Sequence, residues 1–151
     1  MNIHGVDIQV EGKGSETLVM LHGWPDTLAL WNDTVEALSD THQCVRFTLP
    51  AFDAQAPMQA KSLVQMVSFI DEVVCAVSPQ KSVTLVVHDW GCVFGYEYAA
   101  QHPDRVKRMV AVDVVKMLKQ ILRLLNVLIL QLKKLRKIFQ QLQLFQLKLI
   151  L

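Results

Sequence analysis

The chain has 151 residues, of which 52% are hydrophobic and 7% aromatic, and its formal net charge is +1. This length suits one modest domain with a hydrophobic core, and the composition indicates a soluble globular body without a nucleic-acid partner. The charge is unevenly divided. Residues 1–114 hold all 14 acidic residues and seven of the 15 Lys and Arg, whereas residues 115–151 hold eight basic residues and no acid.

The first third of the chain predicts alternating strands and helices. Residues 3–10 alternate around a glycine and predict a strand of a hairpin, and the sequence GKGSE that follows predicts a turn. The apolar run at 17–21 predicts a strand buried on both faces. Residues 30–40 predict a helix and residues 44–49 a second strand, which ends before Pro50. The helix is expected to face inward through Leu30, Trp31, Val35 and Leu38.

A longer helix is predicted over residues 63–77 because its apolar residues recur at the 3.6-residue period. Ser62 is the expected N-cap, and Pro79 follows the end of the helix. The apolar stripe, which we interpret as core packing, consists of Leu63, Met66, Val67, Ile70, Val73, Val74 and Val77.

Two more strands and one helix complete the predicted elements. The strands are expected at 83–87 and 108–114, and the helix between them at 91–101, ending before Pro103. Strands that alternate with helices in this way indicate a parallel sheet with helices on both faces. The fold class predicted from the pattern is therefore α/β.

Location and cofactors are inferred from what the sequence lacks. Residues 1–10 include Asp7 and have neither the basic start nor the apolar core of a signal peptide, and no run of about 18 apolar residues predicts a membrane span. The three cysteines, Cys44, Cys75 and Cys92, are odd in number and lack the spacing of metal ligands. We expect a reduced, cytoplasmic protein without a metal or other cofactor.

Two short motifs follow predicted strands. HGWPD occupies residues 22–26 and HDWGC occupies residues 88–92, while Asp113 lies at the end of the strand predicted at 108–114. Functional residues gather at the carboxyl ends of strands in a parallel sheet, so these three segments are the candidates for a site that takes a small-molecule substrate.

The segment HDWGC fits a nucleophile elbow, the sharp strand-to-helix turn usually written G-x-S-x-G. Asp89 takes the nucleophile position and Gly91 and Cys92 are the small residues behind it, although Val87 stands where glycine is usual. A carboxylate nucleophile suits attack on a saturated carbon with a leaving group, such as an epoxide oxygen or a halide. Water activated by a histidine must then hydrolyse the resulting ester.

The backbone N–H groups of Trp24 and Trp90 are the candidates for an oxyanion hole, which would hold the tetrahedral intermediate of ester hydrolysis. Simpler interpretations stand beside these roles. Asp89 would also be stabilised as a carboxylate at a helix start, and both tryptophans would also pack around a pocket.

The motifs HGWPDT, VVHDWGC and YAAQHPDRVKRMVAVDV, in this order, resemble the alpha/beta-hydrolase superfamily, and the aspartate in HDWG resembles its epoxide hydrolase and haloalkane dehalogenase branch. The resemblance covers residues 1–114 and implies the N-terminal part of an alpha/beta-hydrolase fold. It implies that Asp89 is the nucleophile and Asp113 a candidate acid, with an ordinary strand-end carboxylate an equal alternative for Asp113. The motifs also contain supporting residues: His22, Gly23, Pro25, His88 and Gly91.

The sequence departs from the family pattern in two places. The loop at 48–57, TLPAFDAQAP, has Thr48, Ala51 and Asp53 at the usual Asp and Gly positions. The cap region, two further strands and late catalytic histidine of the family do not follow residue 114, and the last histidine is His102. We therefore expect an incomplete active site and impaired turnover, because water activation lacks its base.

Residues 115–151 form a Leu-, Lys- and Gln-rich tail with 13 leucines and no Gly, Pro or His. One interpretation is an out-of-frame or rearranged coding segment, which the abrupt change of composition favours. The other is a basic amphipathic helix that binds a partner helix or a membrane surface, which would make the chain a non-catalytic interaction protein. The stripe that supports this second interpretation is Leu118, Ile121, Leu125, Leu128, Leu132, Leu135, Phe139 and Leu142.

Overall fold

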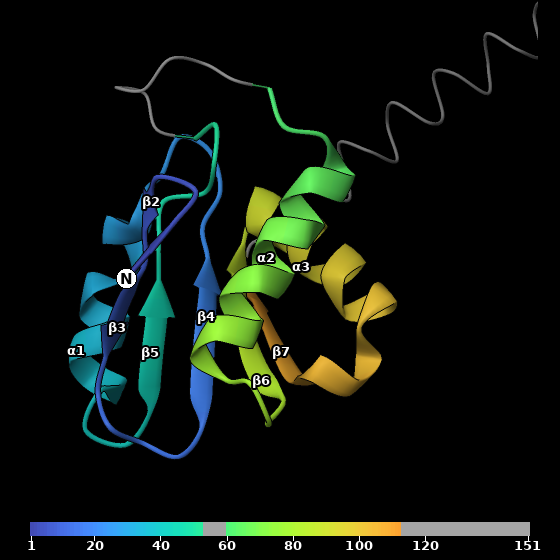
Figure 1. Ribbon diagram of the computed structural model, residues 1–151. Helices are drawn as coiled ribbons and strands as arrows, with labels where there is room; N and C mark the ends of the chain where they lie inside the picture. Colours follow the sequence, from blue (N-terminus) through green and yellow to red (C-terminus); the bar gives the residue numbers. More distant parts are fainter. Residues whose placement is uncertain (53–59, 113–151) are drawn as a thin grey trace, which may run out of the picture. The chain divides into compact units, whose positions relative to one another are not determined.

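The computed structural model describes residues 1–52 and 60–112, and a five-stranded mixed sheet forms the centre of this part (Figure 1). The strands are β3 (Gln9–Glu11), β5 (Gln43–Arg46), β4 (Thr17–Leu21), β6 (Val83–His88) and β7 (Val106–Val112), in this spatial order. β3 pairs antiparallel with β5, and the other neighbours are parallel. The predicted α/β architecture is confirmed, with one antiparallel strand at an edge of the described sheet.

The helices cover both faces of this sheet (Figure 1). The 3₁₀ turn η1 (Leu28–Trp31) and α1 (Asn32–Leu38) pack through Trp31 and Val35 on one face. The long helices α2 (Leu63–Val77) and α3 (Trp90–Gln101) lie on the other. A short 3₁₀ turn, η2 (Pro103–Arg105), joins α3 to β7. Successive residues of a strand point to opposite faces, so β4 and β6 are buried on both.

The N-terminal segment differs from the single strand predicted for residues 3–10. It forms a two-stranded hairpin of β1 (Asn2–Ile3) and β2 (Val6–Asp7), and β3 then joins the main sheet. His4 and Gly5 form the turn with φ angles of 51° and 85°, a left-handed backbone that glycine adopts without strain. The break exists because this turn reverses the chain after only two paired residues.

Helix α2 agrees with the prediction in both of its ends. The Ser62 side chain accepts from the backbone N–H of Gln65, and the Gln65 side chain accepts from that of Ser62, which completes a capping box. Phe69, which lies outside the predicted stripe, is also buried because its ring meets Phe47 edge-on. Leu63 is 40% exposed, because it lies in the first turn beyond the sheet.

Three other predictions need correction. Leu30 is 39% exposed, because η1 rather than the α-helix carries it. The second strand stops at Arg46 instead of Leu49, and the backbone N–H of Leu49 donates instead to a histidine side chain. The last described strand, β7, begins two residues earlier than expected, and Val110 and Val112 on it are 52% and 49% exposed.

Asp113 and the tail at 115–151, for which the sequence predicts a candidate acid and an amphipathic helix or a foreign segment, lie outside the described residues. No helix in the described part of the chain is both long enough and apolar enough to span a membrane.

Candidate active site

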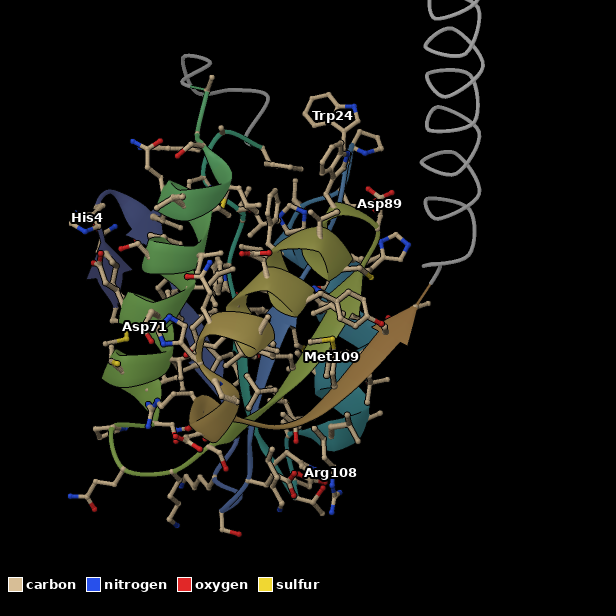
Figure 2. The ribbon with its side chains drawn as sticks, turned by 90° about the vertical axis from the view of Figure 1, so that its right-hand side faces the viewer. His4, Trp24, Asp71, Asp89, Arg108 and Met109 are labelled. Carbon is tan, nitrogen blue, oxygen red and sulfur yellow. The ribbon has the colours of Figure 1, made fainter. Side chains whose placement is uncertain are left out.

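The two motifs meet because their strands are neighbours. β4 and β6 pair in parallel register through Leu21 and Val87, so the loops after them leave the same end of the sheet. A Cβ atom on Gly23 would lie 2.3 Å from Oδ1 of Asp89, which means that only glycine allows the first loop to approach the Asp89 side chain so closely. The expected association of HGWPD with HDWGC is therefore present at the tip of the sheet (Figure 2).

Asp89 sits on a sharp turn between β6 and α3. Its φ is 49° and its ψ is −118°, a backbone that non-glycine residues rarely adopt, and such strain is typical of functional turns. The turn closes where the N–H of Cys92 donates to the carbonyl of Asp89 at 2.9 Å. Gly91 permits this closure, since a Cβ there would lie 2.2 Å from the carbonyl oxygen of Leu21. The geometry is that of an elbow which raises one side chain above the sheet.

The Asp89 carboxylate already contacts one of the candidate oxyanion donors. The backbone N–H of Trp24 donates to Oδ1 of Asp89 at 3.0 Å. Trp90 is the first residue of α3, and the first N–H groups of a helix have no acceptor within it. The Trp24 N–H thus contacts the carboxylate directly, and the Trp90 N–H lies in the first turn of α3, directly after Asp89.

His22 holds the first loop in place from inside the protein. Its ring is fully buried, and it lies 2.8 Å from the carbonyl of Gly23 through Nδ1, while Nε2 accepts from the N–H of Leu49 at 2.9 Å. A ring that donates at Nδ1 and accepts at Nε2 is neutral, and burial lowers the pKa of His22. Both nitrogens are therefore engaged in joining the HGWPD loop to the loop after β5.

His88, the residue before Asp89, faces an acidic partner. Its Nδ1 lies 3.6 Å from Oδ2 of Asp26, and both side chains are partly exposed, at 22% and 36%. Sequence reasoning gave His88 a supporting role and did not single out Asp26. The quoted motif HGWPD contains this aspartate, but nothing in its spacing indicates that it reaches the end of β6.

Four aromatic side chains surround the Asp89 elbow. Trp24 and Phe94 each meet Phe52 edge-on, with ring centroids 6.1 and 6.0 Å apart, and Trp90 stacks on Phe94 at 6.2 Å. Trp24 and Trp90 stay about half exposed, at 54% and 47%. An open apolar surface thus borders the elbow. The sequence predicts that the two tryptophans pack around a pocket, but its motifs do not single out Phe52 or Phe94.

Pro25 follows Trp24 through a cis peptide bond. The described residues contain no group of three His, Cys, Asp or Glu side chains placed to hold a metal ion. The polar groups that the described residues bring to this site include the Asp89 carboxylate with the Trp24 N–H, and the His88–Asp26 pair.

This arrangement of a mostly parallel sheet, flanking helices and a sharp strand-to-helix turn is that of a hydrolase fold. Residues 16–142 match the sequence pattern of the alpha/beta hydrolase fold family, and the chain belongs to this family.

Its relatives include enzymes that act on small molecules. The chain is 35% identical over 107 residues to cis-3-alkyl-4-alkyloxetan-2-one decarboxylase of Shewanella oneidensis, which covers 68% of this chain and 33% of that protein. It is 28% identical over 99 residues to soluble epoxide hydrolase of a Corynebacterium species, which covers 65% and 34%. The chain therefore spans about a third of the length of these relatives.

Solved structures give the same picture. An epoxide hydrolase of Bacillus megaterium in complex with an inhibitor superposes with a TM-score of 0.64 at 28% identity, over 74% of this chain and 40% of that one. An epoxide hydrolase of Vigna radiata superposes with a TM-score of 0.66 at 26% identity, over 76% and 38%. The predicted likeness to the epoxide hydrolase branch is confirmed.

Proposed function

We propose that this chain carries the nucleophile of an epoxide-opening hydrolase and that Asp89 is that nucleophile. The observation that supports this most directly is the strained backbone of Asp89. Its carboxylate accepts a hydrogen bond from the Trp24 N–H at 3.0 Å. A non-glycine residue with a strained backbone lowers the stability of the fold. We therefore infer that an aspartate is retained at this turn for the function of its side chain.

In the first step, an Oδ atom of Asp89 attacks a ring carbon of the epoxide. A carbon–oxygen bond forms to the carboxylate while one ring carbon–oxygen bond breaks, and the alkoxide, which stays on the neighbouring carbon, takes a proton from solvent. The product is an alkyl ester on Asp89. The aromatic border formed by Trp24, Phe52, Trp90 and Phe94 would contact the apolar substituent of the epoxide.

In the second step, water attacks the ester carbonyl of Asp89 and gives a tetrahedral oxyanion. The N–H groups of Trp24 and Trp90 would hold this charge until the diol leaves and the carboxylate returns. The attacking water must lose a proton to a base, and the sequence supplies no histidine after His102. Ester formation without efficient hydrolysis is therefore the behaviour we propose for residues 1–151 tested by themselves, whether or not Asp113 acts as the accompanying acid.

Epoxides are the substrates we propose in preference to haloalkanes, because the relatives and structures named above include epoxide hydrolases. The oxetan-2-one decarboxylase of Shewanella oneidensis is named for another strained oxygen ring, which a carboxylate nucleophile also suits. Both names point to small strained oxygen heterocycles, and the haloalkane is retained as a comparison substrate.

The test is intact-mass spectrometry of the full chain after incubation with styrene oxide, with 1-bromobutane in parallel. We expect a single covalent adduct on the peptide that contains Asp89, its absence in Asp89→Asn, and its retention in Asp33→Asn, which removes an exposed carboxylate from α1. Steady diol production over many turnovers would refute the proposal that the base is missing. An adduct that persists in Asp89→Asn would refute the proposal that Asp89 is the nucleophile.

The alternative of a non-catalytic interaction protein that uses residues 115–151 is not favoured by these comparisons, since the relatives bear the names of enzymes. It has its own test in liposome and partner binding by the full chain and by a chain that ends at residue 114. Binding lost on removal of residues 115–151, together with no adduct at Asp89, would put this alternative first.

A further inference from the structure

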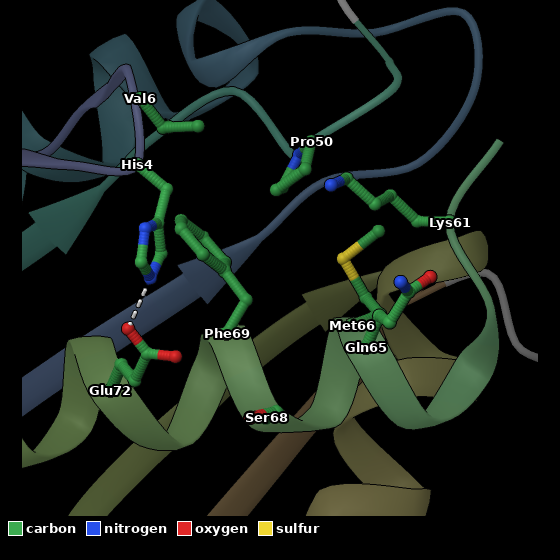
Figure 3. Close-up of a pocket in the computed structure, with 9 residues that line it drawn as sticks. All are labelled: His4, Val6, Pro50, Lys61, Gln65, Met66, Ser68, Phe69 and Glu72. Atoms are coloured by element: carbon green, nitrogen blue, oxygen red, sulfur yellow. Dashed lines mark hydrogen bonds and ion pairs between the residues drawn. The ribbon is translucent and has the colours of Figure 1, made fainter. Parts of the chain in front are cut away.

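A second hollow lies far from the elbow, between the N-terminal hairpin and helix α2. It has a volume of about 390 Å³, within the range of small-molecule pockets (Figure 3). His4 and Asp89 appear on opposite sides of the molecule in Figure 2, and no residue of the aromatic border lines this pocket. A ligand bound in this pocket would therefore not contact the groups proposed to react at Asp89.

The pocket has one wall that the chain holds in place without a ligand. Nε2 of His4 lies 2.7 Å from Oε2 of Glu72, which ties the hairpin turn to α2 across 68 residues of sequence. The turn is itself fixed, because the N–H of Gly5 donates to Oδ1 of Asn2 at 3.0 Å. A preformed wall lowers the ordering cost of binding.

Two side chains with donor groups, Lys61 and Gln65, lie at the opposite end of the pocket. Lys61 has no acidic partner among the described residues, and Figure 3 shows its ammonium group reaching over the pocket towards Pro50. The Gln65 carbonyl oxygen is occupied by the N–H of Ser62 at 2.9 Å, which leaves the amide N–H₂ as the part that can meet a ligand. An ammonium beside an amide donor matches a carboxylate.

The surface between these ends is apolar. Met66 and Phe69 form a floor that is 2% and 6% exposed, and Val6 and Pro50 line the side towards the hairpin. A second negative charge on a ligand would approach the Glu72 carboxylate, which already pairs with His4. The lining therefore favours one negative charge joined to an apolar body.

We propose that this pocket is a binding site for an amphiphilic monocarboxylate, with the carboxylate on Lys61 and Gln65 and the apolar body over Phe69 and Val6. Ser68 has the smallest side chain of the α2 residues that line the pocket. The proposal assigns this chain a ligand site separate from the Asp89 elbow.

The test uses the full chain labelled with ¹⁵N and titrated with sodium octanoate below its micelle concentration. We expect saturable shifts of the backbone amides of α2 and the His4–Val6 turn. Lys61→Met should weaken binding about tenfold, the effect of removing one charge-assisted hydrogen bond. Lys81→Met, which removes another exposed lysine, should leave the affinity unchanged.

Two further measurements test whether the ligand must carry a carboxylate and whether it binds in the pocket beside α2. 1-Octanol, which has the same body without the charge, should bind at least about tenfold more weakly than octanoate. Ser68→Phe should abolish the shifts while the circular dichroism spectrum stays the same. Equal binding of octanol and octanoate, equal binding by Lys61→Met, or shifts centred on Trp24 and Trp90 would each overturn the proposal.

Discussion

Gly23 lies so close to Asp89 that a Cβ atom on the glycine would stand 2.3 Å from Oδ1 and 2.4 Å from Cβ of the aspartate. The backbone of the loop after β4 thus contacts the side chain at the end of β6, and the N–H of the next residue, Trp24, reaches the carboxylate as a result. The position of the proposed nucleophile therefore depends on the absence of a side chain at residue 23.

Gly23→Ala should consequently damage the site more than the fold. The added methyl group must displace either the HGWPD loop or the Asp89 carboxylate, and overpacking of this kind costs about 1–3 kcal/mol. We expect adduct formation with styrene oxide to slow by at least about tenfold, while the urea midpoint falls by an amount that agrees with that cost. Adduct formation at the wild-type rate would show that the close approach has no role in reactivity.

The strain at Asp89 predicts a trade-off between stability and reactivity. Asp89→Gly and Asp89→Ala both remove the nucleophile, but only glycine adopts a φ of 49° without a steric penalty. The glycine variant should be more stable than the alanine variant by about 1 kcal/mol, measured by urea unfolding. Equal stabilities, or a more stable alanine variant, would contradict a strained elbow.

Much of this architecture follows from the sequence because its signals are local. The period of α2, its Ser62 cap and the apolar runs of β4 and β6 depend on residues near one another in the chain, and the observed bounds agree closely with the predicted ones. The two motifs could be placed together because neighbouring parallel strands end at the same edge.

The remaining features could not be predicted because they depend on contacts between distant residues. Phe52 reaches the elbow from the loop after β5, and the pairing of Asp26 with His88 joins residues from two loops. The pocket beside α2 depends on the contact between His4 and Glu72, which no spacing in the sequence encodes. The exposure of Leu30 was mispredicted because a 3₁₀ turn replaces the first helical turn there.

The neutral state of His22 predicts a loss of stability in acid. Burial lowers the pKa of this imidazole from its ordinary value of 6.5, so the unfolded chain binds a proton there that the folded chain does not. The free energy of unfolding should therefore fall as the pH drops below about 6.5. We expect this part of the pH dependence to be absent in His22→Gln, measured by urea unfolding from pH 5 to 8. An unchanged slope in the variant would assign the effect to other groups.

The buried hydroxyl of Tyr98 predicts a fall in the free energy of unfolding at alkaline pH. Burial, with the hydrogen bond from its hydroxyl to Asp71 at 3.1 Å, raises the pKa of Tyr98 above its ordinary value of 10.0. Its contribution is present below that value and is lost as the pH rises above it, because the unfolded chain ionises first. Tyr98→Phe should lose about 1 kcal/mol at neutral pH and show a weaker decline above pH 10. Tyr96→Phe, which removes the hydroxyl of a half-exposed tyrosine from the same helix, is the matched control.

An ester trapped on Asp89 should respond to an added base. If the adduct persists because no base reaches the attacking water, imidazole in solution should hydrolyse it, with a rate that rises with the concentration of neutral imidazole. In water labelled with ¹⁸O, the released chain should carry one heavy oxygen in the peptide that contains Asp89, because water attacks the carbonyl carbon. Labelled oxygen found in the diol alone would indicate attack at the alkyl carbon and contradict the ester mechanism. Equally fast decay without imidazole, slowed by His88→Gln, would identify His88 as a base that the chain already possesses.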